Sequence, residues 1–258
     1  MSEHHEDHHA DDHTGHRHRN ASAPLLMELR EHAPFSISSV AIGLIVAGAL
    51  CILGSQFPEV VEEASGHDHG GDHGDHAHGP PFARLFFHLF HPAHMFFSAA
   101  ATTAMYVRYE RKIAKAIIVG LVGAIGVCGI SDIVMPHISL AILGAQPPWH
   151  ICVIENPSLV LPFAAVGVLV GIATAGAVIR STLISHSLHV LMSTMASIFY
   201  MVGPLGLIAW IDDAGKVFVF VVIAVMLPCC ASDIAFPMLM TSAGRSAYDA
   251  DGCGHCQH

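Results

Sequence analysis

Apolar residues dominate the chain in six runs that are each long enough to cross a membrane. A helix of about 20 residues spans the hydrocarbon core of a bilayer. The predicted spans cover residues 35–55, 84–107, 114–142, 159–180, 183–210 and 217–241. Polar residues interrupt the third and fifth runs, yet the overall pattern predicts an all-α polytopic membrane protein with six transmembrane helices.

The composition agrees with this interpretation. Hydrophobic residues make up 53% of the 258 residues and charged residues only 12%, whereas soluble domains carry about 25% charged residues. The formal net charge is −10, and no basic patch is large enough to follow a phosphate backbone. We therefore expect the lipid bilayer as a partner and no nucleic acid.

The distribution of Lys and Arg predicts the orientation of the spans. With the N-terminus in the cytoplasm, nine of the eleven basic residues lie on the cytoplasmic side, and only Arg84 and Lys216 lie outside. The first 20 residues are polar and lack the apolar core of a cleavable signal peptide. We expect a multi-pass protein of the cell (inner) membrane with both termini in the cytoplasm.

Two sequence motifs occur twice, in the same order. The pattern H-x-x-H-x-x-x-S occupies residues 91–98 in the second span and 186–193 in the fifth. The pattern C-x-x-S-D-I-x-x-P occupies residues 128–136 in the third span and 229–237 in the sixth, with five identities in nine positions. A weaker likeness of small and aliphatic residues joins the first and fourth spans. This recurrence indicates an internal duplication.

Each predicted half contains three spans, so the second half crosses the membrane in the opposite sense to the first. This is the inverted-topology repeat of many secondary transporters, whose binding sites lie near the midplane at the repeat interface. The predicted organisation is a cytoplasmic His-rich tail (1–34), a first three-helix repeat (35–142) with a His-rich outer loop (56–83), an outer linker (143–158), a second three-helix repeat (159–241) and a cytoplasmic Cys/His tail (242–258).

The repeated motifs place ionisable residues inside the membrane, where an Asp at mid-helix costs about 2.5–3.5 kcal/mol. Two His residues three positions apart share one helix face, and imidazoles with carboxylates suit a borderline divalent cation such as Zn²⁺. The predicted ligands are His91, His94, Asp132, His186, His189 and Asp233. Four neutral imidazoles and two carboxylates carry a charge of −2, which one divalent ion would neutralise. One central site and two symmetric sites both fit the pattern.

Neighbouring residues extend this set. Cys128 and Cys229 lie one turn before the two Asp residues, and His88 lies one turn before His91. Hydroxyl groups of both motifs can orient ligands through hydrogen bonds: Ser98, Ser131, Ser193 and Ser232. The alternative is structural, with His pairs that only hydrogen-bond across the bundle and Cys residues that are inert packing.

Three segments outside the spans are rich in metal-binding side chains. The N-terminal tail has seven His within its first 20 residues, the outer loop has five His between residues 67 and 78, and the C-terminal CGHCQH contains a C-x-x-C pair. Such tracts are typical of multivalent metal traps. They lie on both predicted sides of the membrane, so they leave the direction of transport open.

Together these features predict a secondary transporter or channel, not an enzyme, that moves a divalent transition-metal cation. Zn²⁺ is the expected ion, while Ni²⁺, Co²⁺, Fe²⁺, Mn²⁺ and Cu remain open. Proton exchange is a natural coupling because metal ligands release protons on binding. The oligomeric state is open, a homo-oligomer included. The alternatives are a metal-sensing or accessory membrane protein without transport, and a membrane oxidoreductase with haem between His94 and His189.

Overall fold

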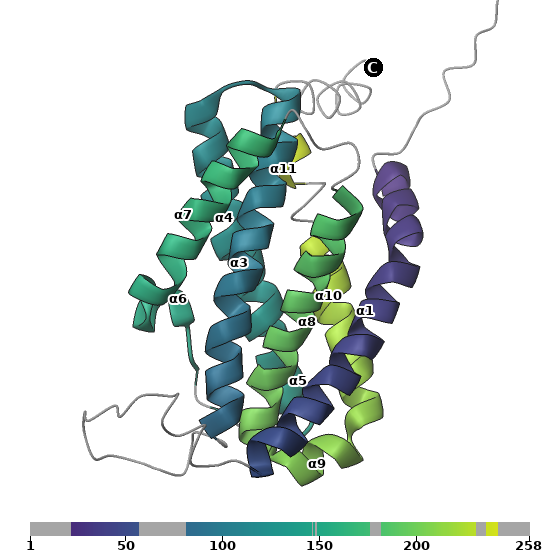
Figure 1. Ribbon diagram of the computed structural model, residues 1–258. Helices are drawn as coiled ribbons and strands as arrows, with labels where there is room; N and C mark the ends of the chain where they lie inside the picture. The colour runs from purple at the N-terminus through teal and green to yellow at the C-terminus, as the bar shows by residue number, and fades with distance from the viewer. Residues whose placement is uncertain are drawn as a thin grey trace, which may run out of the picture.

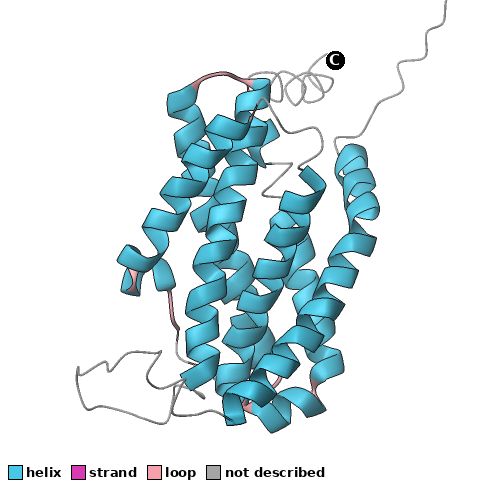
Figure 2. Cartoon of the chain, in the orientation of Figure 1, coloured by secondary structure: helices cyan, strands magenta, loops and turns pink. Residues whose placement is uncertain are grey.

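The structure is a computed structural model, and it describes residues 22–56, 81–145, 147, 149–175, 182–230 and 236–241. These residues form helices and short connections, with no strand among them (Figure 2). The long helices lie side by side in one elongated bundle (Figure 1). The predicted all-helical class is therefore confirmed for the part of the chain that the structure describes.

The first half of the chain forms three long helical segments. Helix α1 spans Ser22–Gln56, and α3 spans Pro81–Tyr109. The third segment runs without interruption through α4 (Ile113–Gly129), the π-helix η1 (Ile130–Val134) and α5 (Met135–Ile142). Helix α1 begins well before the first predicted span, so it takes in residues that the polarity pattern assigned to the N-terminal tail.

The second half is more divided. Its helices are α6 (Cys152–Glu155), α7 (Pro157–Thr174), α8 (Thr182–Leu205), α9 (Leu207–Asp212), α10 (Ala214–Cys230) and α11 (Phe236–Leu239). The predicted fifth span is split because Gly206, between α8 and α9, has a φ of 73°. Glycine adopts that conformation without the steric penalty that other residues meet.

Four helical segments are long and apolar enough to cross a membrane: Ser36–Gln56, Ile113–Ile142, Pro157–Thr174 and Leu188–Leu205. Large aliphatic side chains cover the outer faces of three of them, with Ile45 74%, Ile118 62% and Leu169 63% exposed. Apolar surface of this extent marks contact with lipid or with another apolar partner. The length and the exposed apolar faces of these helices indicate a membrane protein.

Helices α3 and α8 pack against each other in the interior. Helix α3 also packs against α4 and α7, and α8 against α1 and α10. Glycines allow the close approach of α7 to α3, since a Cβ atom on Gly167 would lie 2.4 Å from a backbone oxygen of α3 and one on Gly171 would lie 2.5 Å from another. This arrangement buries the polar motifs of α3 and α8 inside the bundle.

Candidate metal centre

Two imidazoles meet where α3 and α8 face each other. His94 and His189 are fully buried, and their Nε2 atoms lie 3.2 Å apart. The rings are in edge contact, with centroids 4.5 Å apart and planes inclined by 77°. The second histidine of each H-x-x-H motif is thus brought to one place.

Two thiols border the same nitrogen atom. Cys128 Sγ lies 3.6 Å from His94 Nε2, and Cys229 Sγ lies 3.7 Å from it. The donor atoms of His94, His189 and Cys229 all lie within 4.8 Å of one another. We call these three residues, with Cys128 beside them, the central cluster.

The spacings within the central cluster fit a tetrahedral metal ion. With Zn–N bonds of about 2.0 Å and Zn–S bonds of about 2.3 Å, two ligand nitrogens lie about 3.3 Å apart, and a nitrogen and a sulfur about 3.5 Å apart. The observed separations are 3.2 Å between the nitrogens and 3.6 Å and 3.7 Å from nitrogen to sulfur. The cluster could therefore hold such an ion with small side-chain adjustments.

Asp132 lies behind the histidines, with both carboxylate oxygens occupied. Its Oδ2 accepts hydrogen bonds from Nδ1 of His91 at 2.8 Å and of His94 at 2.7 Å. Its Oδ1 accepts hydrogen bonds from the hydroxyls of Ser131 and Ser193, each at 2.9 Å. A carboxylate offers about four lone-pair positions, so none is left for a metal. This geometry favours Asp132 as an orienting residue over the direct ligand that the sequence pattern predicts.

The bond to Asp132 decides which nitrogen of His94 faces the thiols. In a neutral imidazole one nitrogen carries the hydrogen and the other carries the lone pair. Because Nδ1 of His94 donates to the carboxylate at 2.7 Å, Nε2 keeps its lone pair beside the thiols. Metal-bound histidines are commonly oriented by a carboxylate in this way.

Asp132 lies in a π-helical turn, which is wider than the α-helix on either side of it. Pro136 has no N–H to donate to the carbonyl four residues earlier, which removes one α-helical hydrogen bond. The chain is a π-helix over Ile130–Val134, a distortion that is frequent at functional sites. The hydroxyl of Ser197 on α8 donates to the backbone oxygen of Ser131 at 3.1 Å. The widened turn is thus tied to the neighbouring helix.

His91 is linked to the central cluster by its hydrogen bond to the Asp132 carboxylate. Its ring stacks on Phe87, with centroids 5.1 Å apart and planes inclined by 11°. Its Nε2 is buried and has no hydrogen-bond partner among the described residues. His91 thus supplies a spare nitrogen donor one helical turn from the central cluster.

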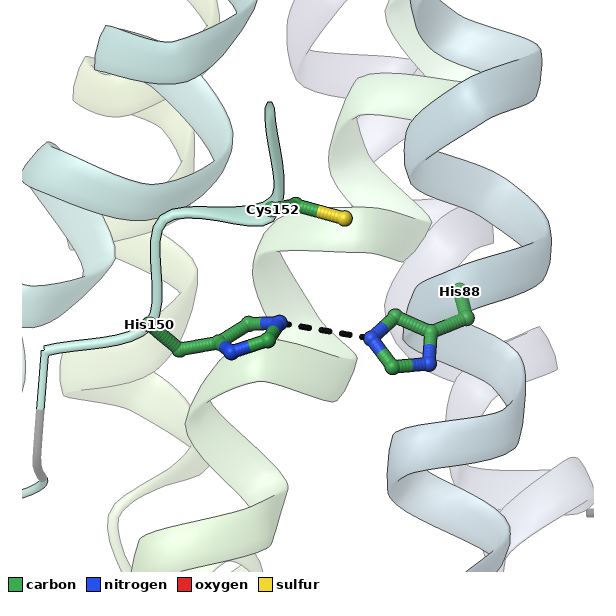
Figure 3. Close-up of side chains that lie close together, drawn as sticks. All are labelled: His88, His150 and Cys152. Carbon is green, nitrogen blue, oxygen red and sulfur yellow. Dashed lines mark hydrogen bonds between the residues drawn. The ribbon is translucent and has the colours of Figure 1, made fainter. Parts of the chain in front are cut away.

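His88, the third histidine of α3, lies apart from the central cluster. Its Nε2 is 3.3 Å from Nε2 of His150, and one ligand atom from each of His88, His150 and Cys152 lies within 4.8 Å of the other two (Figure 3). Burial, with a smaller contribution from the Glu155 carboxylate, raises the pKa of the Cys152 thiol to about 11. Sequence reasoning missed His150 and Cys152, for which the H-x-C spacing in the linker was the available signal.

The structure brings six of the nine predicted site residues together: His91, His94, Cys128, Asp132, His189 and Cys229. The predicted orienting hydroxyls Ser131 and Ser193 bond to the carboxylate of this group. His186 belongs to α8, but its side chain lies outside the described residues, as does the whole of Asp233.

Comparison with protein-family models, with curated proteins and with solved structures finds no match for the chain.

Proposed function

We propose that the protein is a secondary transporter or channel for a divalent transition-metal cation, with Zn²⁺ as its cargo. The observation that carries this proposal is the central cluster, a buried group of imidazole and thiol donors among helices of membrane length. Polar groups at membrane depth are costly, and they commonly mark ion pathways. The protein has no catalytic role in this proposal.

The donor set favours zinc and related borderline metals. Imidazole and thiolate suit Zn²⁺ and Cu, whereas oxygen ligands suit Mg²⁺, Ca²⁺ and Mn²⁺. With Cys229 as a thiolate, its charge and that of the Asp132 carboxylate would together balance one divalent ion. Haem is disfavoured, because axial ligands stand on opposite faces of a porphyrin, whereas the two Nε2 atoms here are 3.2 Å apart with thiols beside them.

The central cluster is divided between the two predicted halves, which supports movement of the ion. His94 and Cys128 come from the first half, and His189 and Cys229 from the second. A rocking motion of one half against the other would separate these donors and release the ion.

Helix packing supports the inverted repeat. Exchange of the two halves relates α1 to α7, α3 to α8, and α4 to α10. The contact of α3 with α7 then corresponds to that of α8 with α1, and the contact of α3 with α4 to that of α8 with α10. The contact of α4 with α7 corresponds to that of α10 with α1. All six helix pairs are in contact. The α3–α8 pair corresponds to itself, so it would lie on the pseudo-twofold axis.

Close contacts repeat at corresponding positions as well. The motif of α3 recurs 95 residues later in α8. Gly167 packs against α3 so tightly that a Cβ atom there would lie 2.4 Å from the backbone oxygen of Phe96 and 3.0 Å from Ala99 Cβ.

The weak likeness between the first and fourth spans aligns AIGLIV (residues 41–46) with AVGVLV (165–170), so Gly43 corresponds to Gly167. Gly43 packs against α8. A Cβ atom on Gly43 would lie 2.4 Å from a side-chain carbon of Thr194 and 3.8 Å from one of Leu191. Leu191 and Thr194 are the positions 95 residues after the two contacts of Gly167 on α3. The weak likeness between the first and fourth spans thus coincides with equivalent packing.

This symmetry favours one central ion over two separate sites. His94 and His189 are equivalent positions, and they face each other. Cys128 and Cys229 are equivalent too, at 3.6 Å and 3.7 Å from the same nitrogen. An ion bound between them would lie on the pseudo-twofold axis, where both halves can hold it.

The repeat also suggests a role for Asp233 and His186, whose side chains lie outside the described residues. By analogy with Asp132, Asp233 would orient His186 and His189. Helices α3, with 29 residues, and α10, with 17, would complete six spans in the inner membrane. Both termini would be cytoplasmic, and exchange of protons for metal would follow from the displacement of protons by the ion.

Transport is tested with the full-length protein in proteoliposomes that contain a zinc-sensitive dye and, in parallel, a pH dye. We expect rapid entry of added Zn²⁺ with protein, none in protein-free vesicles, and no comparable flux of Mg²⁺ or Ca²⁺. A simultaneous pH change would identify proton exchange. Tight zinc binding without any flux would contradict transport and leave the metal-sensing or accessory function.

A further inference from the structure

A second group of nitrogen and sulfur donors lies outside the central cluster. His88 belongs to α3, His150 to the segment that leads into α6, and Cys152 is the first residue of α6 (Figure 3). The two Nε2 atoms are 3.3 Å apart, and each of His88, His150 and Cys152 has a ligand atom within 4.8 Å of those of the other two. The separation of the nitrogens equals the edge of about 3.3 Å expected between two histidine ligands of tetrahedral zinc.

A carboxylate orients one of these imidazoles, as in the central cluster. Nδ1 of His150 is hydrogen-bonded to Oε2 of Glu155. Oε1 of the same carboxylate accepts the backbone N–H of Ile151 at 3.1 Å. Nε2 of His150 is thereby left to face His88. In this group a carboxylate orients one histidine, and that histidine faces a second histidine and a cysteine. The central cluster has the same order, with Asp132, His94, His189 and Cys229.

Packing holds this linker segment against the bundle. Trp149 stacks on His137, with ring centroids 3.7 Å apart and planes inclined by 22°. The Cys152 side chain is fully buried although the neighbouring Ile151 and Ile154 are exposed. The donors therefore stand on a supported segment rather than on a free loop.

We propose that His88, His150 and Cys152 form a second binding site for a borderline divalent metal of the zinc class, which we call the peripheral site. His88 and His94 are six residues apart on α3, a rise of about 9 Å. Between them lies His91, with its spare nitrogen. The peripheral site would load the central cluster from one side of the membrane; that role rests on the proposed transport, whereas metal binding does not.

The peripheral site also breaks the symmetry of the repeat. The position equivalent to His88 in the second half is Leu183, which cannot bind a metal. A transporter with a symmetric central site would therefore have a loading site on one side only. On the predicted topology this is the outer side, where the linker lies.

Cobalt binding tests the peripheral site in the full-length chain. Cysteines 253 and 256 are replaced with serine in every sample, so that the C-terminal tail cannot form cobalt–thiolate bonds. Co²⁺ is titrated anaerobically, and the thiolate-to-cobalt charge-transfer absorption is recorded. We expect Cys152→Ser and His150→Ala each to remove the part of the absorption that belongs to the peripheral site, while Ile154→Ala, a change of an exposed neighbour, leaves the absorption unchanged.

Two further variants separate the sites and the roles. Cys229→Ser with His189→Ala should remove the central contribution and leave that of the peripheral site. Glu155→Gln should weaken cobalt binding at the peripheral site about 10- to 100-fold, the usual effect of losing an orienting partner. Identical titrations for Cys152→Ser and its parent would overturn the peripheral site and leave the transport proposal standing. Peripheral binding without zinc flux in vesicles would overturn transport alone.

Discussion

The charge of Asp132 should control metal binding without touching the metal. In Asp132→Asn the side-chain oxygen can still accept the hydroxyls of Ser131 and Ser193. Its amide group, however, would face Nδ1 of His91 and His94, where the carboxylate now accepts at 2.8 Å and 2.7 Å. A donor at that place favours the other tautomer of each histidine, with the proton on Nε2.

A proton on Nε2 of His94 occupies the lone pair that faces the thiols. We therefore expect the affinity of the central cluster to fall 10- to 100-fold, which corresponds to about 1.4–2.8 kcal/mol. The assay is the cobalt–thiolate titration in the background without tail cysteines. Thermal unfolding of the metal-free protein should change little, because the amide still bonds to all four partners.

The matched control is Asp213→Asn, the same substitution in a partly exposed carboxylate between α9 and α10 that pairs with Lys216 at 2.5 Å. It should leave the titration unchanged. An Asp132→Asn variant that binds cobalt as tightly as its parent would refute the orienting role. A variant that loses its fold before metal is added would show that the carboxylate is needed for packing instead.

Three further predictions follow from the packing and the donor set. Gly167→Ala should destabilise the protein by about 1–3 kcal/mol, because the new Cβ would lie 2.4 Å from a backbone oxygen. Thermal unfolding measures this loss of stability. Gly126→Ala is the control, since a Cβ at Gly126 would have no neighbouring atom within 4 Å. Ser193→Ala should weaken cobalt binding about tenfold, because it removes a 2.9 Å hydrogen bond to Asp132. Ser139→Ala is the control and should leave cobalt binding unchanged, because the Ser139 hydroxyl donates to a backbone oxygen of its own helix. Zinc binding should weaken as pH falls and should release protons in an unbuffered titration, because protons compete for imidazole and thiolate; pH-independent affinity would contradict this donor set.

The helices and most of the cluster follow from local patterns. Runs of apolar residues predict long helices, and the spacing of His91 and His94 places both on one face. The sequence pattern fits either one central site or two symmetric sites, and the structure brings His94 and His189 together at 3.2 Å. The six-span count stays a prediction, because the described part of the chain has four segments long and apolar enough to cross.

The role of Asp132 could not be predicted from its identity. A buried carboxylate beside histidines can bind a metal or orient the histidines, and the choice depends on where its oxygens point. That is decided by the π-helical turn over Ile130–Val134 and by the hydroxyls of Ser131 and Ser193. Neither the turn nor the register against α8 is encoded in a short motif.

The peripheral site was hidden for a different reason. His88 and His150 are 62 residues apart, and no repeated motif links them. Their meeting depends on how the linker folds back along α3, which is a tertiary contact. His186 and Asp233 lie outside the described residues, so their predicted roles rest on the repeat alone.

The central claim is that metal crosses the membrane through donors from both halves of the chain. Its most direct test is zinc flux in proteoliposomes for Cys229→Ala and His189→Ala, with Cys51→Ala as the control because that buried cysteine of α1 lies outside both donor groups. We expect flux to be lost in the two cluster variants and kept in Cys51→Ala. Flux at the parent rate in a folded Cys229→Ala or His189→Ala protein would contradict it.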